Sequence, residues 1–285
     1  MAARLIDGKA LAERIRRRVA GEVAELGHVG LATVLVGDDP ASEVYIRLKQ
    51  RAAAEAGIDA RDIRLDASAS ESDVLDLVHE LNADDGVDGL LVQLPLPSHI
   101  DETRVTYAVA PHKDVDGFHP VNAGNLYLGT PLHVPATPAG CMALLGEYGV
   151  DPKGKDAIVI GRSEIVGRPA AMLLLQAHAT VTICHSRTHD LGAEVARGDI
   201  VVAAVGVPGI VTTDMVKPGA AVVDVGLTRG EDGTIRGDVD PAVAEVAALL
   251  TPMPGGTGPM TIALLLESAV KAARYRRGLL AYPTL

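Results

Sequence analysis

Apolar and polar positions follow two alternating periods along most of this chain. Short runs rich in Val, Ile and Leu, bounded by Gly, Asp or Pro, alternate with stretches that repeat every three to four residues. In the first half this pattern predicts helices at 9–26, 40–56 and 71–81 and strands at 31–37, 62–65 and 89–94. In the second half it predicts strands at 157–161, 180–184, 199–206 and 220–226 and a last helix at about 260–277. Alternation of this kind is typical of an α/β architecture with mainly parallel sheets.

A segment rich in Pro and Gly, residues 110–140, separates the two halves and shows little periodicity. We interpret it as an interdomain crossing, and as a natural place for a cleft. A length of 285 residues fits one large domain or two ordinary ones.

Composition narrows the class of protein. Hydrophobic residues make up 48% of the chain, and 26 basic against 37 acidic residues give a net charge of −11, which argues against nucleic acid or an anionic membrane as a partner. The N-terminus lacks the apolar core of a signal peptide, and the longest apolar runs are too short to span a bilayer. Cys141 and Cys184 lie inside apolar segments, which predicts buried free thiols. We therefore expect a cytoplasmic protein.

The predicted helix at 40–56 contains a Tyr-x-x-x-Lys pair. Asp39 and Pro40 mark its start, and Gly57 marks its end. Its apolar stripe consists of Val44, Leu48 and Ala52. Tyr45 and Lys49 are four residues apart, so they lie on one flank of that stripe, at the edge between core and solvent. A cleft could use them there. The alternative is that Tyr45 packs its ring while Lys49 extends its amine to water.

A glycine turn opens the second half, where residues 156–176 read as strand, tight turn and helix, "DAIVIGRSEIVGRPAAMLLLQ". Gly161 and Ser163 occupy the first two positions of a G-x-G-x-x-G pattern, but Val166 takes the third and Gly167 follows. Backbone N–H groups at such a helix start attract a pyrophosphate. A purely structural strand-to-helix turn is the alternative.

The end of the next strand, "CHSRT", indicates which dinucleotide is expected. An NAD enzyme usually carries Asp or Glu there for the ribose hydroxyl. Ser186 and Arg187 stand there instead, with Arg162 in the preceding turn. A hydroxyl and two cations suit a 2′-phosphate, which favours NADP, although each arginine alone is equally typical of an ordinary surface. His185 and His189 begin at a strand end without supporting carboxylates, so we expect loop residues and no metal.

Six motifs in this order carry a resemblance to a known family: "SEVYIRLK", "VQLPLP", "KDVDGFHPVNAGNL", "GRSEIVGRP", "CHSRT" and "PGGTGPMT". Over nearly its whole length the chain resembles the bifunctional methylenetetrahydrofolate dehydrogenase/cyclohydrolases. That family oxidises methylene-tetrahydrofolate to the methenyl form with NADP and then hydrolyses it to formyl-tetrahydrofolate. The resemblance implies a role in one-carbon metabolism, including purine biosynthesis, and a homodimer built through the nucleotide domains.

The resemblance also implies a two-domain α/β fold with folate bound in the cleft. We expect an N-terminal catalytic domain at 1–137, completed by a returning helix at about 260–285. A doubly wound, Rossmann-type NADP-binding domain would occupy 138–259.

Site residues are carried over by motif. The resemblance makes Lys49 the catalytic lysine and places Tyr45 along the pterin, while Gln93 orients the lysine and Asp116 anchors the pterin. The remaining expected substrate contacts are Val92, Leu94, Pro254, Gly255 and Gly256. The expected cofactor contacts are Gly161, Arg162, Ser163, Ser186 and Leu227, with Arg187 added by the phosphate argument.

The residue types suit the chemistry. Hydride passes directly to the nicotinamide, so that step needs positioning more than acid or base. Hydrolysis needs water activation, which a lysine with a pKa lowered by burial performs near neutral pH. Gln93 would hold this lysine by hydrogen bonding without cancelling its reactivity.

Three positions depart from the family pattern. Ala136 stands where the family usually has Cys, at a position that we regard as non-catalytic. Thr257 replaces a common Val, with a slight expected effect on folate contacts. Glu164, near the phosphate site, is expected to weaken NADP binding.

Two rival hypotheses remain. A shikimate-type NADP dehydrogenase would share the nucleotide half but would not explain "VQLPLP" or "KDVDGF". A catalytically silent nucleotide-binding protein would predict a damaged set of site residues.

Overall fold

The chain folds into two compact units. The computed structural model describes residues 2–37, 40–230 and 233–281, and in the helix that begins at Pro40 it describes side chains from Ile46 onward. The Lys49 unit consists of Glu13–Pro135 and the residues from Ile262 onward, and the Gly161 unit consists of Ala136–Thr261 and the residues up to Ala12. Helices α1 (Gly8–Leu26) and α9 (Thr257–Arg276) each contribute residues to both units.

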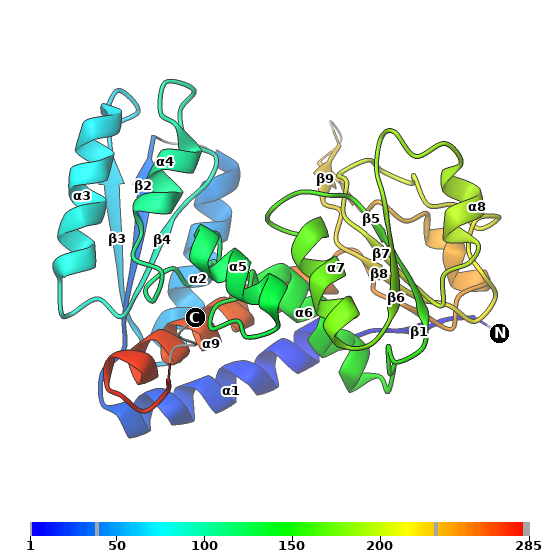
Figure 1. Cartoon of the computed structure of the whole chain (residues 1–285), viewed down its shortest axis with the longest axis horizontal. Helices are drawn as coiled ribbons and strands as arrows, with labels where there is room; N and C mark the ends of the chain where they lie inside the picture. The colour runs from blue at the N-terminus through cyan, green and yellow to red at the C-terminus, as the bar shows by residue number, and fades with distance from the viewer. Residues whose placement is uncertain (1, 38–39, 231–232, 282–285) are drawn as a thin grey trace. The chain divides into compact units, whose positions relative to one another are not determined.

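The Lys49 unit contains a three-stranded parallel sheet in the order β3-β2-β4. Its strands are β2 (Gly30–Val36), β3 (Asp59–Leu65) and β4 (Gly89–Val92). Its other helices are α2 (Pro40–Glu55), α3 (Glu71–Ala83), α4 (Glu102–Ala108) and α5 (Pro120–Leu128). Helices α3 and α4 stand beside the sheet (Figure 1). Each strand of this unit matches a predicted one, with ends that differ by a few residues.

The two faces of this sheet differ in chemistry. Val34 of β2 and Leu90 of β4 belong to one buried apolar cluster with Val74 and Val78 of α3. Side chains alternate along a strand, so Thr33 of β2 belongs to the opposite face. That second face carries the polar residues of the candidate site.

The Gly161 unit contains a six-stranded parallel sheet in the order β1-β11-β8-β7-β5-β6. Its strands are β1 (Arg4–Leu5), β5 (Asp156–Ile160), β6 (Thr180–Cys184), β7 (Ile200–Ala203), β8 (Ala221–Asp224) and β11 (Leu249–Leu250). A hairpin of β9 (Thr228–Arg229) and β10 (Ile235–Arg236) follows β8.

Helices cover both faces of the six-stranded sheet. They are α6 (Ala136–Glu147), α7 (Gly167–Gln176), α8 (Leu191–Val195) and the 3-10 helix η1 (Pro241–Glu245). One apolar cluster joins the sheet to α6 and α7, and a second joins it to α8 and η1. Figure 1 shows α7 and α8 on opposite sides of the strands. This arrangement is the predicted doubly wound fold.

The segment between the two halves, which shows little periodicity, contains helices that the sequence pattern did not predict. α5 lies inside residues 110–140 and α6 begins there. The sequence marks both ends of α5, because Pro120 occupies its first turn and Gly129 ends it with φ of 85°. The many Pro and Gly residues of the segment obscure its periodicity, although two of them mark the ends of a short helix.

Two further expectations can be compared with the structure. Cys141 and Cys184 are buried free thiols, as predicted. Among the residues with described placement, no helix combines the length and apolarity needed to cross a membrane.

Asp88, just before β4, ties the sheet to α9. It is 2% exposed, accepts the Gly30 N–H at 2.9 Å through one oxygen and contacts the Arg276 guanidinium at 2.9 Å through the other. The same arginine contacts Asp85 at 3.1 Å, but Asp85 is fully exposed. The two acids therefore form a matched pair, because one charge is buried and the other is hydrated.

Asp88→Ala is expected to lower the free energy of unfolding by about 3 kcal/mol, since it leaves a partly buried guanidinium and a buried N–H without their partner. Asp85→Ala should leave unfolding unchanged within error, because solvent screens an exposed ion pair. Urea unfolding of both variants checks the prediction, and equal effects would contradict it.

Candidate active site and nucleotide site

Lys49 lies on the buried face of α2. The predicted apolar stripe was wrong at Leu48, which is 52% exposed, and right at Ala52, which is buried, while Lys49 is only 5% exposed. The buried positions of the described part of this helix are Ile46, Lys49, Ala52, Ala53 and Ala56. The alternative in which Lys49 extends to water is therefore excluded. The side chains of Tyr45 and Val44 lie outside the described residues.

Gln93 holds the Lys49 amine. Lys49 Nζ donates to Gln93 Oε1 at 3.2 Å, and Gln93 Nε2 donates to the Leu94 carbonyl at 2.8 Å. The Gln93 backbone N–H continues the sheet by donating to the Val34 carbonyl at 2.8 Å. The amide is therefore fixed at both ends, and it offers the amine an acceptor without a charge.

Two acids surround Lys49 electrostatically. Burial lowers the pKa of Lys49, and Asp116 and, less strongly, Asp62 oppose that shift. Burial raises the pKa of Asp116 to about 6, against the effect of the Lys49 ammonium and with a contribution from Asp114. The amine and the Asp116 carboxyl are thus both shifted toward neutral pH, the range in which a group exchanges protons efficiently.

Asp114, which sequence reasoning passed over, shapes the loop that carries Asp116. It is 4% exposed and accepts N–H groups of Gly117 at 3.1 Å and His119 at 2.7 Å, together with the Asn122 amide at 2.8 Å. A buried carboxylate with three donors fixes the backbone around it. The first acid of "KDVDGF" is therefore structural, and the second is presented by the loop.

The glycine turn after β5 has the close backbone approaches expected of a nucleotide loop. Gly161 has φ of 121°, and a Cβ there would lie 2.3 Å from the Ala204 carbonyl oxygen. A Cβ on Gly167 would lie 2.2 Å from the Gly161 oxygen. Ser163 Oγ accepts the N–H groups of Val166 at 3.2 Å and Gly167 at 3.3 Å. The turn and the N-terminus of α7 fit a dinucleotide pyrophosphate.

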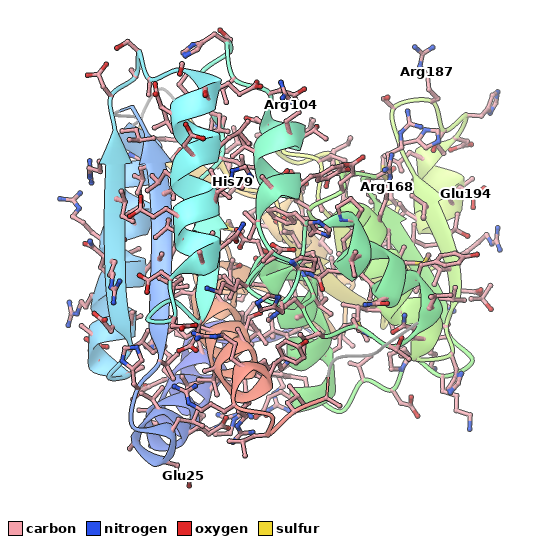
Figure 2. The ribbon with its side chains drawn as sticks, turned by 60° about the vertical axis from the view of Figure 1, so that its left-hand side comes forward. Glu25, His79, Arg104, Arg168, Arg187 and Glu194 are labelled. Atoms are coloured by element: carbon pink, nitrogen blue, oxygen red, sulfur yellow. The ribbon has the colours of Figure 1, made fainter. Side chains whose placement is uncertain are left out.

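The three residues predicted to bind the 2′-phosphate are solvent-accessible. Arg162, Ser186 and Arg187 are exposed, and Ile160 pairs with Cys184, so the segments that carry them leave adjacent strand ends. Figure 2 shows Arg187 at the tip of its loop with its side chain pointing away from the ribbon.

Neighbouring residues settle two secondary points. His185 Nδ1 accepts the Arg187 N–H at 3.0 Å, which is a loop-forming contact. The expectation that Glu164 opposes phosphate is weakened, because Glu164 pairs with Arg168 at 2.9 Å.

Buried Asp224, at the end of β8, fixes the loop that carries Leu227. One Asp224 oxygen accepts the N–H groups of Gly226 and Asp238 at 3.0 Å each, and the other accepts the Val239 N–H at 3.1 Å. Burial raises the pKa of Asp224 to about 6 despite these bonds. The exposed Leu227 therefore stands beside an anchored turn.

Asp238 anchors the loop after β7 in the same way. It is fully buried, and its Oδ2 accepts the N–H groups of Val205 at 2.6 Å and Gly206 at 3.1 Å. Thr257, expected to influence folate contacts, is buried and donates to the Asp224 carbonyl at 3.1 Å. Both aspartates were missed from sequence, where acids at the ends of apolar runs gave the available signal.

In the Lys49 unit, a buried lysine is held by an amide and lies near two acids, which is typical of a proton-transfer centre. In the Gly161 unit, a glycine turn follows a parallel strand, which is typical of a dinucleotide-binding domain. Together these features indicate an enzyme that uses a dinucleotide. Comparisons with known proteins identify the family. Residues 6–116 match the family model described as tetrahydrofolate dehydrogenase/cyclohydrolase, catalytic domain, and residues 135–277 match the NAD(P)-binding domain of the same family. The chain belongs to the tetrahydrofolate dehydrogenase/cyclohydrolase family.

Individual relatives agree over nearly full length. The bifunctional protein FolD of Acidiphilium cryptum is 57% identical over 97% of this chain and 100% of its own. The structure of the bifunctional dehydrogenase/cyclohydrolase from Campylobacter jejuni is 46% identical with a TM-score of 0.95, covering 96% of this chain and 100% of that one. The Trypanosoma brucei enzyme, in complex with NADP and an inhibitor, is 38% identical with a TM-score of 0.92, covering 99% and 100%.

The family, the α/β fold and the bifunctional enzyme class predicted from sequence are confirmed. The rival shikimate-type hypothesis has a structural basis, because shikimate dehydrogenase of Thermus thermophilus is 17% identical with a TM-score of 0.51 over 87% of this chain and 99% of that one. At that identity the likeness concerns the fold alone.

Roles of individual residues stay predictions. The predicted folate contacts are divided between the units, with Val92 and Leu94 in the Lys49 unit and Pro254, Gly255 and Gly256 in the Gly161 unit.

Gly167→Ala tests the glycine turn. Its Cβ would collide with the Gly161 carbonyl, so the turn must open, and we expect nucleotide affinity to fall on the order of tenfold, since backbone strain of this kind costs about 1–3 kcal/mol. Gly146→Ala, in α6, is the control, because its Cβ meets no neighbouring atom within 4 Å. Titration with NADP measures both, and unchanged affinity in Gly167→Ala would refute the assignment of the turn.

Proposed function

We propose that this enzyme uses NADP to oxidise methylene-tetrahydrofolate to methenyl-tetrahydrofolate, and that Lys49 carries the proton transfers of the following hydrolysis. The observation that carries the lysine assignment is an amine that is 5% exposed, has a pKa lowered by burial and is held by Gln93 at 3.2 Å.

The hydrolysis needs a proton acceptor and a proton donor at one place. Neutral Lys49 takes a proton from the water that attacks the methenyl carbon. The resulting ammonium then returns that proton to the ring nitrogen as the carbon–nitrogen bond breaks, which regenerates the neutral amine, while the second proton of the attacking water is released to solvent as the formyl carbonyl forms. One proton leaves and one returns through the same group, and Gln93 keeps the amine in place during both steps.

Asp116 is proposed to bind the pterin. Its carboxylate accepts N–H groups from the amino-pyrimidine edge, and a pKa of about 6 means that binding favours pH values at which it is ionised. Tyr45 lies along the pterin in this proposal. The further folate contacts are Val92, Leu94, Pro254, Gly255 and Gly256.

The oxidation depends on position rather than on proton transfer. When bound, NADP supplies the hydride acceptor. Ser163 presents its backbone N–H group to the pyrophosphate, Gly161 supplies the tight turn that lets the backbone approach it, and Leu227 is a further cofactor contact. Arg162, Ser186 and Arg187 recognise the 2′-phosphate. The NADP complex of the Trypanosoma brucei relative supports this cofactor.

The proposed domain roles agree with the two units except at the N-terminus, where the residues up to Ala12 belong to the Gly161 unit. We propose that residues 1–137 with the helix at about 260–285 supply the folate-binding catalytic domain, and that 138–259 supply the NADP-binding domain. A homodimer joined through the nucleotide domains, in the cytoplasm, is inferred from the family resemblance and from two free thiols.

Lys49→Met separates the two activities, because methionine keeps the apolar stem and removes the amine. We expect hydrolysis of methenyl-tetrahydrofolate to fall by about 10²–10⁴-fold, the usual contribution of general acid–base catalysis. Oxidation of methylene-tetrahydrofolate should be impaired less, so the methenyl form accumulates. The measurement supplies the methenyl form directly and subtracts spontaneous hydrolysis. Hydrolysis at the parent rate would exclude Lys49 as the proton-transfer residue.

Arg187→Asp should reduce the preference for NADP over NAD. Losing a charge-assisted hydrogen bond costs about 1.5–3 kcal/mol, or roughly tenfold or more in NADP affinity. Arg197→Asp makes the same charge change at an exposed position paired with Glu194, away from the strand ends, and should leave the preference unchanged. The test compares kcat/KM for NADP with kcat/KM for NAD in each variant. Equal kcat/KM values for the two cofactors in the parent enzyme would overturn NADP specificity.

A further inference from the structure

We propose that Asp62 is a positioning residue for the hydrolysis, a second carboxylate that acts on Lys49 from strand β3, so that the amine works between two acids rather than beside one. This inference rests on the proton-transfer role proposed for Lys49. None of the motifs that identify the family includes Asp62, which lies in β3 between the helix of Lys49 and the loop of Asp116.

Strand register places Asp62 on the polar face of the three-stranded sheet. It pairs with Thr33 of β2 in parallel register, so the two side chains share a face. Thr33 is 3% exposed and pairs on its other side with Leu91 of β4. Gln93 lies two residues beyond Leu91 and continues the same face. This face of the sheet therefore carries Thr33 from β2 and Asp62 from β3, with Gln93 just beyond the end of β4.

The Asp62 carboxylate is held in place from α2 and β2. Gln50, the neighbour of Lys49 in α2, donates from Nε2 to Asp62 Oδ2. The Thr33 side chain also hydrogen-bonds Asp62, and both bonds lower its pKa. A carboxylate fixed by an amide and a hydroxyl has little freedom to turn away. Asp62 is thus oriented by the same helix that supplies the amine.

Lys49 and Asp62 each favour the charged form of the other. Burial raises the pKa of Asp62, while Lys49 and then Arg64 lower it by favouring the carboxylate. Burial lowers the pKa of Lys49, while Asp116 and then Asp62 raise it by favouring the ammonium. The charged groups facing the amine are therefore Asp116 from the loop and Asp62 from the sheet. Loss of either negative charge moves the Lys49 pKa further down.

The second acid has a distinct task when substrate is bound. Asp116 then shares its charge with the pterin N–H groups, which weakens its hold on the amine. The contacts of Asp62 with Gln50 and Thr33, and the nearby charge of Arg64, all come from the protein and do not depend on substrate. Asp62 stabilises the ammonium that forms when Lys49 takes a proton from water, and so favours that step.

Asp62→Asn removes the charge and preserves the shape. The limb of the pH–rate profile for methenyl-tetrahydrofolate hydrolysis that reports Lys49 should move to lower pH by about one unit, the scale of losing one nearby opposite charge. Asp59→Asn, an exposed position of the same strand on the opposite face, is the matched control and should leave the limb in place. Spontaneous hydrolysis is subtracted at each pH.

A direct titration separates this inference from the lysine assignment. The ε-carbon of Lys49 is followed by 13C NMR in the folded enzyme, and its signal is identified by its loss in Lys49→Met. A Lys49 pKa that falls in Asp62→Asn together with the rate limb supports the proposal. An unchanged pKa or an unchanged limb overturns it. Normal hydrolysis by Lys49→Met overturns the lysine assignment instead. If Asp62→Asn folds poorly, Asp62→Ser and Gln50→Ala test the same shift.

Discussion

The burial of one amine constrains the architecture of the Lys49 unit. An ammonium that leaves water without compensation is strongly disfavoured, so a helix that buries Lys49 needs acceptors and negative charge at fixed distances from it. The three-stranded sheet supplies these acceptors and charges because its two faces carry different kinds of side chain. One face packs as an apolar cluster against α3, and the other carries Gln93 and Asp62. The compensation is incomplete, because burial outweighs both acids and the Lys49 pKa stays lowered. The proton-transfer role proposed for Lys49 depends on that residual shift.

Buried carboxylates serve a second purpose throughout the chain. Asp88, Asp114, Asp224 and Asp238 each accept backbone N–H groups where a segment enters or leaves a parallel sheet. Parallel strands end in loops whose N–H groups lack ladder partners, and a short acidic side chain satisfies two or three of them at once. Part of the net charge of −11 is therefore internal. It argues less about the outer surface than the composition alone suggests.

The sequence was informative where a feature is local and less so where it depends on register. The longer strands of both sheets and the glycine turn follow from residue type, because apolar runs and Gly161 impose their own backbone, whereas the two-residue strands β1 and β11 were not predicted. The stripe of α2 was partly misplaced because Lys49 counts as polar in any periodicity, and only its partners on other strands explain its burial. Asp62 was invisible for the same reason, since its position depends on the pairing with Thr33. The motif resemblance found Gln93 and Asp116 without that information.

The two activities place opposite demands on their surroundings. Hydride transfer needs a fixed nucleotide, and the loops of the Gly161 unit are held by backbone hydrogen bonds to Asp224 and Asp238. Hydrolysis needs a group that changes charge twice, and in the proposed mechanism this group is Lys49, whose pKa is lowered by burial. A titratable group beside the nicotinamide would bring a pH dependence that hydride transfer does not need, whereas a fully paired lysine could not exchange protons. Placing rigid backbone contacts in one unit and a poised amine in the other lets a single chain meet both demands.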